Sequence, residues 1–520
     1  MLYLMDFKEG TEFKIYREKK IPHIRCIALD AMQEFGESIL NKLWTILEER
    51  NEQFVEASRE GREIKNISEY RRAGYHMPRI LVVLDEFQVL FDRDHNKKAA
   101  DRAASRMSDF ISKGRVYGIH FIFATQTMHK IFEGGSAISR ATLEEMHIRI
   151  GLQCQPKEME LLFGETNFKE CRKKASAKKG SAIYLENDIV SQPVGMQVAY
   201  ADPEEQQRLL GEIEEHFTDQ EFEPAVVFRG KEEYSFPAEA FLQNLDGQTA
   251  VYLGEPIAIE EPVRISFSKK KRGNLLAVGE MQSMLDRISV LWTWQAAMMN
   301  KGYGGTSVYL FDGAQMIDGK PLLNERIQVQ CGGTVKVIDN VFRVIPAVDE
   351  LYEIFEGRKK RMVQGVKEPG DEQKLHMVVS NYQWIEPMMR LMERRSISEF
   401  EVEQEKPDEQ NRLDGLLSML NDNGGRKGNG PVQKLHVLLE SGYLCGIQVL
   451  FTCSDFSAVK KVTSADLAPF VNRVLLKTVT SAAYMLVDSD INMKNIRENT
   501  ALFSDGVHQP YLFKPYILDR

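Results

Sequence analysis

The chain has 520 residues, of which 43% are hydrophobic and 28% are charged. Its formal net charge of −9 at pH 7 excludes a protein that is basic over its whole surface, although a local basic channel is compatible with it. No apolar run is long enough to span a bilayer, and the six cysteines are scattered without metal-ligand spacing. This composition is typical of a soluble globular protein, and the length predicts about two to four domains.

The first part of the chain alternates between short apolar runs and amphipathic segments. Runs rich in β-branched residues predict buried strands, and apolar residues at helical spacing predict the helices between them. Strands and helices that alternate in this way indicate a parallel, doubly wound α/β sheet. The predicted strands are 2–7, 24–30, 79–85, 119–126 and a fifth that begins at His147, and the predicted helices are about 34–58 and 99–113.

A change of composition follows these elements. The charged helical stretch EEQQRLLGEIEEHF leads through EFEPAVVF into a Pro-containing segment. Charged and Pro-containing stretches of this kind are typical of domain boundaries. We therefore predict a first core over 1–220, a β-containing connector over 221–264 and a second core over 265–520.

The second half of the chain repeats the first. SVYLFDG matches LYLMDFKEG, TVKVIDN matches IRCIALD, and KLHMVVSNYQWI matches RILVVLDEFQVL. LCGIQVLFTCSDF and NRVLLKT then match VYGIHFIFATQTM and HIRIGLQ. Each match is weak by itself, but because all of them occur in the same order we predict two tandem copies of one α/β core.

The second copy contains a strand and a helix that the first copy lacks. This unit, NLLAVGEMQSMLDRISVLWTWQAAMM, precedes SVYLFDG, whereas the matching segment of the first copy begins at Met1. Judged by the repeat, roughly 30 to 40 residues of the first core are missing. Either an upstream part is absent from this chain, which we favour, or the first copy simply lacks the unit. A phosphate-binding loop would lie in this unit, and no G-x-x-x-x-G-K-[ST] motif occurs anywhere in the chain.

The second copy has lost the residues of a phosphate site. Leucine cannot neutralise phosphate charge, and an acid at a helix start repels it. The second copy also lacks an acidic pair at the end of its third strand. We therefore predict that it is inactive and has a structural or partner-binding role. Aligned on Gly279, the residues at the positions of the second Gly, the Lys and the Ser/Thr are Met284, Leu285 and Asp286, and the residues at the positions of the acids are Ser380 and Asn381.

The first copy keeps two acids at the end of its third strand, Asp85 and Glu86. An aspartate in this position can bind Mg²⁺ through the water shell of the ion, and the adjacent glutamate can polarise an attacking water. Gln126, at the end of the next strand, can sense a γ-phosphate. Strands often end in acids by chance, so the pair alone is weak evidence, and the ATQ one strand later strengthens it.

A family resemblance rests on these residues. LVVLDEF followed by SKGRVYGIHFIFATQT resembles the FtsK/SpoIIIE-like P-loop ATPases, and so do the opening YLMDFKEGTEF and the PHI that follows it. The resemblance covers about residues 1–200, and it reaches 265–520 only through the internal repeat. It implies two tandem RecA-like P-loop NTPase cores with mainly parallel sheets flanked by helices, the first of which lacks its P-loop strand and helix. It also implies a ring, commonly a hexamer, in which ATP hydrolysis drives a polymer through the pore.

The resemblance assigns roles to individual residues. It implies that Asp85 is the Walker B acid for Mg²⁺, that Glu86 is the catalytic glutamate, and that Gln126 is the sensor, with ATP as the cofactor. An arginine finger from a neighbouring subunit is also implied, and Arg140 and Arg149 lie in the expected region. Arg115 is a third option for the finger. Because the Walker A element is missing, we expect the chain alone to bind ATP weakly or not at all.

Three functions are compatible with these residues. The first is translocation of double-stranded DNA, for which basic clusters offer phosphate contacts without base readout. The second is a type VII secretion-like ATPase that moves or recruits protein, and the third is a non-catalytic scaffold. The resemblance implies a cytoplasmic location and leaves open a membrane anchor on an upstream region. The candidate DNA contacts are Lys173, Lys174, Lys269, Lys270, Lys271 and Arg272.

Overall fold

The fold is that of a computed structural model, which divides the chain into two compact units. Unit 1 comprises 1–232 and 257–260, and unit 2 comprises 233–256 and 261–520. Within the described residues, no helix combines the length and the apolar character needed to cross a bilayer. The structure describes all residues except 9–11, 60–62, 133–134, 187–191, 219, 246–247, 269–271, 367–372, 388, 390–429, 464–466, 490, 495 and 519–520.

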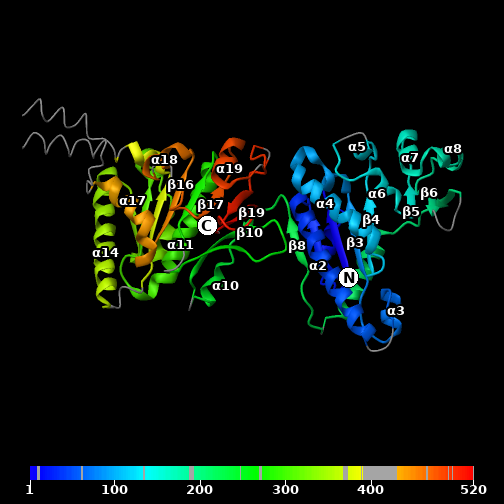
Figure 1. The fold of residues 1–520 in the computed structure, drawn as a ribbon, viewed down its shortest axis with the longest axis horizontal. Coiled ribbons are helices and arrows are strands. Elements are labelled where there is room, and N and C mark those ends of the chain that lie inside the picture. Colours follow the sequence, from blue (N-terminus) through cyan, green and yellow to red (C-terminus); the bar gives the residue numbers. More distant parts are fainter. Residues whose placement is uncertain are drawn as a thin grey trace, which may run out of the picture. The chain divides into compact units, whose positions relative to one another are not determined.

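Unit 1 is built on a parallel sheet in the order β4-β3-β1-β2-β8. Helices α2 and α4 pack against each other along this sheet (Figure 1). The strands of unit 1, in this sheet and in a second one, are β1 (Leu2–Asp6), β2 (Ile24–Leu29), β3 (Ile80–Asp85), β4 (Ile119–Ala124), β5 (Ile148–Gly151), β6 (Ser181–Glu186), β7 (Val194–Gln197) and β8 (Val226–Arg229). Its helices are α1 (Lys14–Arg17), α2 (Gln33–Arg59), α3 (Ile67–Arg72), α4 (Arg93–Lys113), α5 (His129–Phe132), α6 (Arg140–Glu144), α7 (Pro156–Phe163), α8 (Glu165–Lys174) and α9 (Pro203–His216).

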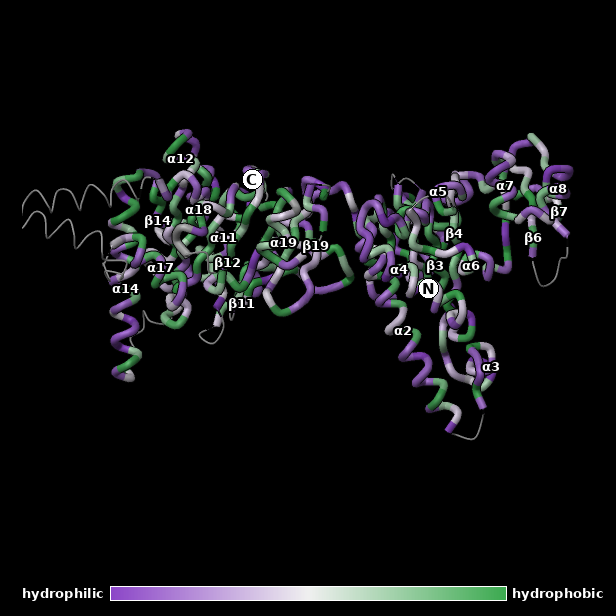
Figure 2. Tube along the Cα trace, turned by 45° about the horizontal axis from the view of Figure 1, so that its top comes forward, coloured by the Kyte–Doolittle hydropathy of each residue, from purple (hydrophilic) through white to green (hydrophobic). Residues whose placement is uncertain are grey.

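The sequence explains the long helix α2 and its packing. Apolar residues recur along it at helical spacing and are buried, while the residues between them are mostly charged and exposed. In Figure 2 the trace of α2 accordingly alternates between hydrophobic and hydrophilic colour. The buried side chains on the apolar side include Phe35, Ile39, Leu40, Leu43 and Leu47.

The predicted place of the fifth strand is wrong. β5 does not join the main sheet of unit 1 but pairs antiparallel with β6, which pairs antiparallel with β7 in a separate three-stranded sheet. The fifth strand of the main sheet is instead β8, which pairs in parallel with β2. The periodicity of a strand shows that it is half-buried and does not show which strand lies beside it.

Unit 2 contains one eleven-stranded sheet with the path β11-β10-β19-β18-β17-β12-β16-β15-β13-β14, and β9 pairs with β19. Its strands are β9 (Tyr234–Ser235), β10 (Ala250–Pro256), β11 (Val263–Ser266), β12 (Leu275–Val278), β13 (Val308–Asp312), β14 (Val335–Ile338), β15 (Leu375–Ser380), β16 (Ile447–Cys453), β17 (Asn472–Leu475), β18 (Ala501–Ser504) and β19 (Tyr511–Ile517). Its described helices are α10 (Ala238–Gln243), α11 (Gln282–Asn300), α12 (Gly313–Asp318), α13 (Glu325–Cys331), α14 (Val344–Gln364), α17 (Pro431–Ser441), α18 (Phe456–Thr463) and α19 (Thr480–Val487).

The two units share one topology. The strand order β4-β3-β1-β2 of unit 1 corresponds to β16-β15-β13-β14 of unit 2. The antiparallel strands β5-β6-β7 correspond to β17-β18-β19. In unit 2 these two groups are joined by β12, which pairs in parallel with β16 and with β17. The prediction of two α/β cores with mainly parallel sheets flanked by helices is therefore confirmed, and unit 1 has no described strand at the position of β12.

Candidate functional site

Three acids meet where β1 and β3 of unit 1 end. Asp6 ends β1 and lies opposite Asp85 in the parallel register, and Glu86 follows directly. Asp6 and Glu86 are buried, with 1% and 5% of their surfaces exposed. The carboxyl ends of parallel strands are where open α/β sheets bind their ligands. The structure thus brings Asp85 and Glu86 together, and it adds Asp6.

The backbone turns sharply at Glu86. Its φ of 51° and ψ of 44° are left-handed, a conformation that is uncommon for a residue other than glycine. Neighbouring residues of a strand point to opposite faces, and the turn changes this geometry for Glu86. Asn381, which holds the equivalent position after β15 in unit 2, has a φ of 61°. The turn is therefore a feature that both cores share.

A chain of polar contacts joins the end of β3 to the end of β4. Glu86 Oε2 accepts a hydrogen bond from Gln88 Nε2 at 2.5 Å, and Gln88 Oε1 accepts one from the Thr125 hydroxyl at 2.7 Å. Lys8 Nζ lies 3.7 Å from Glu86 Oε1 and donates a hydrogen bond to Gln126 Oε1 at 3.2 Å. The structure therefore places Gln126 beside Glu86, with the Lys8 ammonium between them.

Sequence reasoning missed Asp6 and Lys8. Lys8 is also tied to Asp6, because its backbone N–H donates to Asp6 Oδ1 at 2.8 Å. The repeat carries a signal for Asp6, because Asp312 has the same register in unit 2. No comparable signal exists for Lys8, since Ala314 lies two residues after Asp312.

The surroundings of Asp85 disfavour its ionised form. Burial is the main cause that raises the pKa of Asp85 above its ordinary value, and the negative charges of Asp6 and Glu86 add to it. The backbone N–H of Glu86 donates to Asp85 and partly offsets the rise. A bound cation would relieve this repulsion, because an opposite charge favours ionised carboxylates.

The two arginine candidates line the same cavity as Gln126. This cavity of about 540 Å³ lies between the end of β4 and the strand β5. Arg140 donates to the Glu144 carboxylate at 2.8 Å, and Arg149 donates to the backbone oxygen of Glu144 at 3.0 Å. Burial lowers the pKa of Arg149, whereas Arg140 is mostly exposed, with 57% of its side-chain surface accessible. Arg115 precedes β4 and so lies at the opposite end of that strand from Gln126.

The described candidates for DNA contact have partners within the chain. Lys173 forms an ion pair with Glu170 at 2.6 Å, and Lys174 donates to the backbone oxygen of Pro193 at 2.6 Å. Arg272 donates to the backbone oxygen of Ala468 at 2.9 Å. Lys269, Lys270 and Lys271 lie outside the described residues.

At the equivalent corner of unit 2, two uncharged amide side chains form hydrogen bonds with each other and with an aspartate. Gln282 donates to Asp286 Oδ1 at 2.8 Å and to Asn381, and Asn381 donates to Asp286 at 3.2 Å. Leu285, at the position of a P-loop lysine, is fully buried in the core. Burial raises the pKa of Asp286, and the two amide donors oppose the rise. The side-chain hydrogen bonds described among Gln282, Asp286 and Asn381 involve no lysine or other basic side chain.

Unit 1 fits one half of a nucleotide site. Mg²⁺ keeps most of its waters and is bound by one or two carboxylates together with substrate phosphates, which suits Asp85 with Asp6. No group of three or more His, Cys, Asp or Glu in the described part of the chain is arranged to hold a metal ion by protein ligands alone. A phosphate also needs backbone N–H groups at a helix start, and unit 1 has no described strand and helix at the position of β12 and α11.

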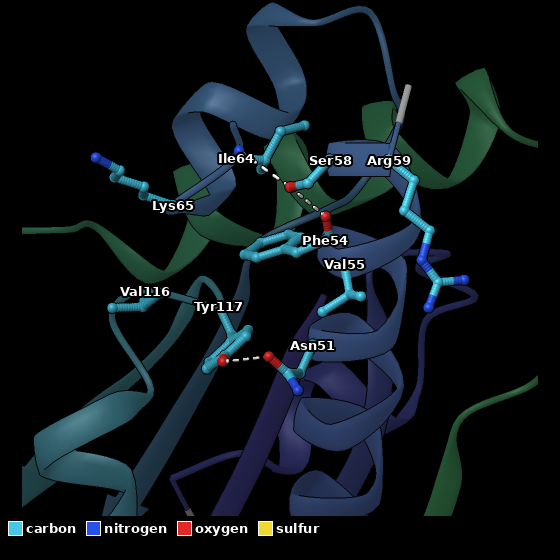
Figure 3. Close-up of a pocket in the computed structure, with 9 residues that line it drawn as sticks. All are labelled: Asn51, Phe54, Val55, Ser58, Arg59, Ile64, Lys65, Val116 and Tyr117. Atoms are coloured by element: carbon cyan, nitrogen blue, oxygen red, sulfur yellow. Dashed lines mark hydrogen bonds between the residues drawn. The ribbon is translucent and has the colours of Figure 1, made fainter. Parts of the chain in front are cut away.

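Another pocket of unit 1 lies away from this corner (Figure 3). It has a volume of about 350 Å³ and is lined by residues of α2, by Ile64 and Lys65, and by Val116 and Tyr117, which precede β4. The Tyr117 hydroxyl donates to Asn51 Oδ1 at 2.8 Å, and the Tyr117 ring stacks on Phe54. Because β4 begins here and ends at the acids, this pocket and the acidic corner lie at opposite ends of the strand.

The fold of the whole chain is similar to solved structures of paired ATPase domains. It aligns over 100% of its length with ATPases 2 and 3 of EssC from Geobacillus thermodenitrificans, at 14% identity and a TM-score of 0.55, and covers 85% of that chain. It aligns over 100% of its length with ATPases 2 and 3 of Thermomonospora curvata EccC in complex with a signal sequence peptide. That match has 13% identity and a TM-score of 0.50, and covers 82% of that chain.

A third structure is the cytoplasmic domain of the Thermomonospora curvata type VII secretion ATPase EccC. The chain matches 53% of it at 14% identity, with a TM-score of 0.49. No family model matches the sequence, and no curated protein does. The first two structures show that the fold is that of two RecA-like ATPase cores, as predicted.

Proposed function

We propose that the chain is part of a type VII secretion-like ATPase that moves or recruits protein, in which unit 1 hydrolyses ATP and unit 2 does not. The convergence of Asp85, Glu86 and Gln126 at one corner of unit 1 carries the proposal. It occurs in a chain that shares its whole fold with the paired ATPase domains of EccC and EssC. One of those structures holds a signal sequence peptide, which favours protein over DNA as the substrate.

Each residue of the corner has a distinct role in the proposal. Asp85, with Asp6 beside it, would hold Mg²⁺ through water, and the ion would neutralise charge on the phosphates. Glu86 would accept a proton from the attacking water, and Gln88 and Lys8 hold its carboxylate at the end of β3. Lys8 contacts both Glu86 and Gln126, so a change at Gln126 can reach the base through the Lys8 ammonium.

The arginine finger in this proposal is Arg140. A finger must reach a nucleotide on a neighbouring subunit, and the described contacts of the Arg140 guanidinium are an exposed ion pair with Glu144 and a cation–π contact with the Phe132 ring. Exposed ion pairs contribute about 1 kcal/mol or less, so this one can be exchanged for a phosphate. Arg149 is half-buried and bonded to backbone oxygens, which favours a structural role for it.

DNA translocation is the alternative, and the described structure gives it less support. Non-specific DNA binding depends on basic side chains that are available to phosphates. Lys173, Lys174 and Arg272 all have partners within the chain, and the formal net charge is −9.

The test is ATP hydrolysis by a version of the chain that carries a strand, a Gly-rich phosphate-binding turn and a helix ahead of Met1. Its rate is measured alone, with a signal sequence peptide, and with double-stranded DNA, with Glu86→Gln as the blank. Stimulation by the peptide supports the proposal. Stimulation by DNA alone replaces it with the DNA motor, and a rate equal to the blank under all three conditions replaces it with the non-catalytic scaffold.

A further inference from the structure

Unit 2 contains a cavity of about 790 Å³ that the proposed function does not use. It lies beside the C-terminal end of helix α11 and the start of β15. The corner of Gln282 and Asn381 lies at the other ends of these two elements. The volume of the cavity falls within the range of about 300–1,000 Å³ that is typical of small-molecule sites.

Five large apolar side chains line this cavity. Leu242 and Leu245 come from α10 and the loop after it, and Trp294, Met298 and Met299 come from α11. Trp294 and Met298 also belong to the hydrophobic core of unit 2, whereas Leu242 is 41% exposed. Methionine side chains are flexible and adapt to apolar surfaces of varied shape. This lining therefore suits an apolar chain.

The indole of Trp294 is held in place by the protein itself. Its Nε1 donates a hydrogen bond to Gln330 Oε1 at 2.8 Å, and its ring lies 6.0 Å from the ring of Phe241 in a tilted arrangement. The single polar atom of the indole is thus satisfied, and what the ring offers a ligand is apolar surface. A lining that is already in place costs a ligand less ordering entropy.

Two lysines line the same cavity, and none of its described lining residues is acidic. Lys374, directly before β15, is half-buried, and burial lowers its pKa below the ordinary value. Lys301 follows α11 and donates to the backbone oxygen of Gln330 at 3.3 Å. Among the described contacts, neither lysine pairs with a carboxylate. A charge that is partly removed from water without an opposite charge is unfavourable, so an anion in the cavity would be stabilised.

We propose that this cavity binds an amphiphilic anion, whose acidic headgroup pairs with Lys374 and whose apolar chain packs against Trp294, Met298 and Met299. A free fatty acid and a single-chain phospholipid fragment share this chemistry. DNA does not, because it has charge without an apolar chain. The proposal is independent of the proposed hydrolysis of ATP, because the cavity lies in unit 2 and the acidic corner lies in unit 1.

The first test is calorimetry of the full chain with laurate below its micelle concentration. We expect one laurate to bind per chain with micromolar affinity. Acetate has the headgroup without the chain, and dodecyltrimethylammonium has the chain with the opposite charge, so neither should bind detectably. Dodecyl phosphate should also bind. Tighter binding of the phosphate would identify a phospholipid fragment as the source of the ligand, and tighter binding of laurate would identify a free fatty acid.

Substitutions of Lys374 separate binding from folding. Lys374→Met should weaken laurate binding roughly tenfold or more, because a hydrogen bond between two charged groups is lost. It should also raise the urea midpoint of unit 2, because it removes a half-buried charge. Lys374→Arg keeps the charge and should bind nearly as the wild type does. Lys320→Met is the matched control, because Lys320 is an exposed lysine of unit 2 outside the cavity.

A second measurement locates the apolar chain. A fatty acid with a bromine at the end of its chain quenches tryptophan fluorescence on contact, and the chain has four tryptophans. We expect saturable quenching of the wild type and much less quenching of Trp294→Phe. Trp44→Phe is the control, because Trp44 lies on α2 of unit 1, and it should be quenched as strongly as the wild type.

Three results would overturn the proposal. They are acetate binding as tight as laurate binding, laurate binding by Lys374→Met that equals the wild type, and full quenching that persists in Trp294→Phe. None of them bears on Glu86, and loss of hydrolysis in Glu86→Gln would in turn leave laurate binding unchanged. The two proposals therefore fail separately.

Discussion

Truncation of two isoleucines in one strand should cost very different amounts of stability. Ile119 and Ile122 both lie in β4, but Ile119 is 2% exposed and Ile122 is 48% exposed. For the buried residue, Ile→Ala should lower the free energy of unfolding of unit 1 by about 3 kcal/mol, from lost burial and the cavity left behind. For the half-exposed residue, roughly half of the burial is lost and no closed cavity forms, so the cost should be about 1 kcal/mol.

The difference of about 2 kcal/mol corresponds to a factor of about 30 in the unfolding equilibrium. Native-state amide hydrogen exchange of β3 and β4 measures the free energy of unfolding of unit 1 separately from that of unit 2. Leu450→Ala in β16 is the reference, because Leu450 has the register of Ile122 and is fully buried. Equal costs for Ile119→Ala and Ile122→Ala would refute the difference in burial between the two ends of β4.

Three further predictions concern the acidic corner. In the extended chain, Glu86→Gln should leave nucleotide binding intact and lower turnover by about 100-fold or more in a phosphate-release assay, because it removes the base, and unchanged turnover would contradict its role. The chain as given should show no micromolar ATP binding in calorimetry, because it lacks the phosphate-binding half of the site. Asp85→Asn should stabilise unit 1 at pH 7 in urea unfolding. Because the pKa of Asp85 is raised in the folded state, the wild type loses stability as the pH rises from the ordinary value of 3.8 through the folded-state pKa. The stabilisation by Asp85→Asn should therefore shrink as the pH falls toward 3.8 and should be absent below that pH.

The elements that the sequence predicted well are those fixed by local pattern. The strands of the main sheet carry uninterrupted apolar runs, and the long helix α2 carries a clear 3.6-residue period. The order of the repeat identified β12 to β17 in unit 2 from the same signals. The closeness of Asp85, Glu86 and Gln126 was predictable because strand ends in a parallel sheet meet at one edge, and their roles stay a prediction.

Sequence could not predict the pairing of β5 or the position of Lys8. A parallel strand needs a neighbour, and in the described part of unit 1 the only strand that pairs with β5 is the antiparallel β6. β8 pairs with β2, although about 200 residues separate the two strands in the sequence, and local patterns carry no information about such distant pairs. Lys8 looked like an ordinary surface lysine, and only the turn after β1 brings it to Glu86.

The two corners differ in what an incoming phosphate would have to displace. In unit 1 the Lys8 side chain is 51% exposed, so the lysine can leave Glu86 and regain water, and the buried Glu86 carboxylate then needs another cation in its place. In unit 2 the Gln282–Asp286–Asn381 network is partly to fully buried, and opening it would leave buried polar groups without partners. Both corners share the left-handed turn, so the backbone does not separate them. Only the corner of unit 1 includes a described lysine contact to an acid, and this difference is why our proposal places the nucleotide in unit 1.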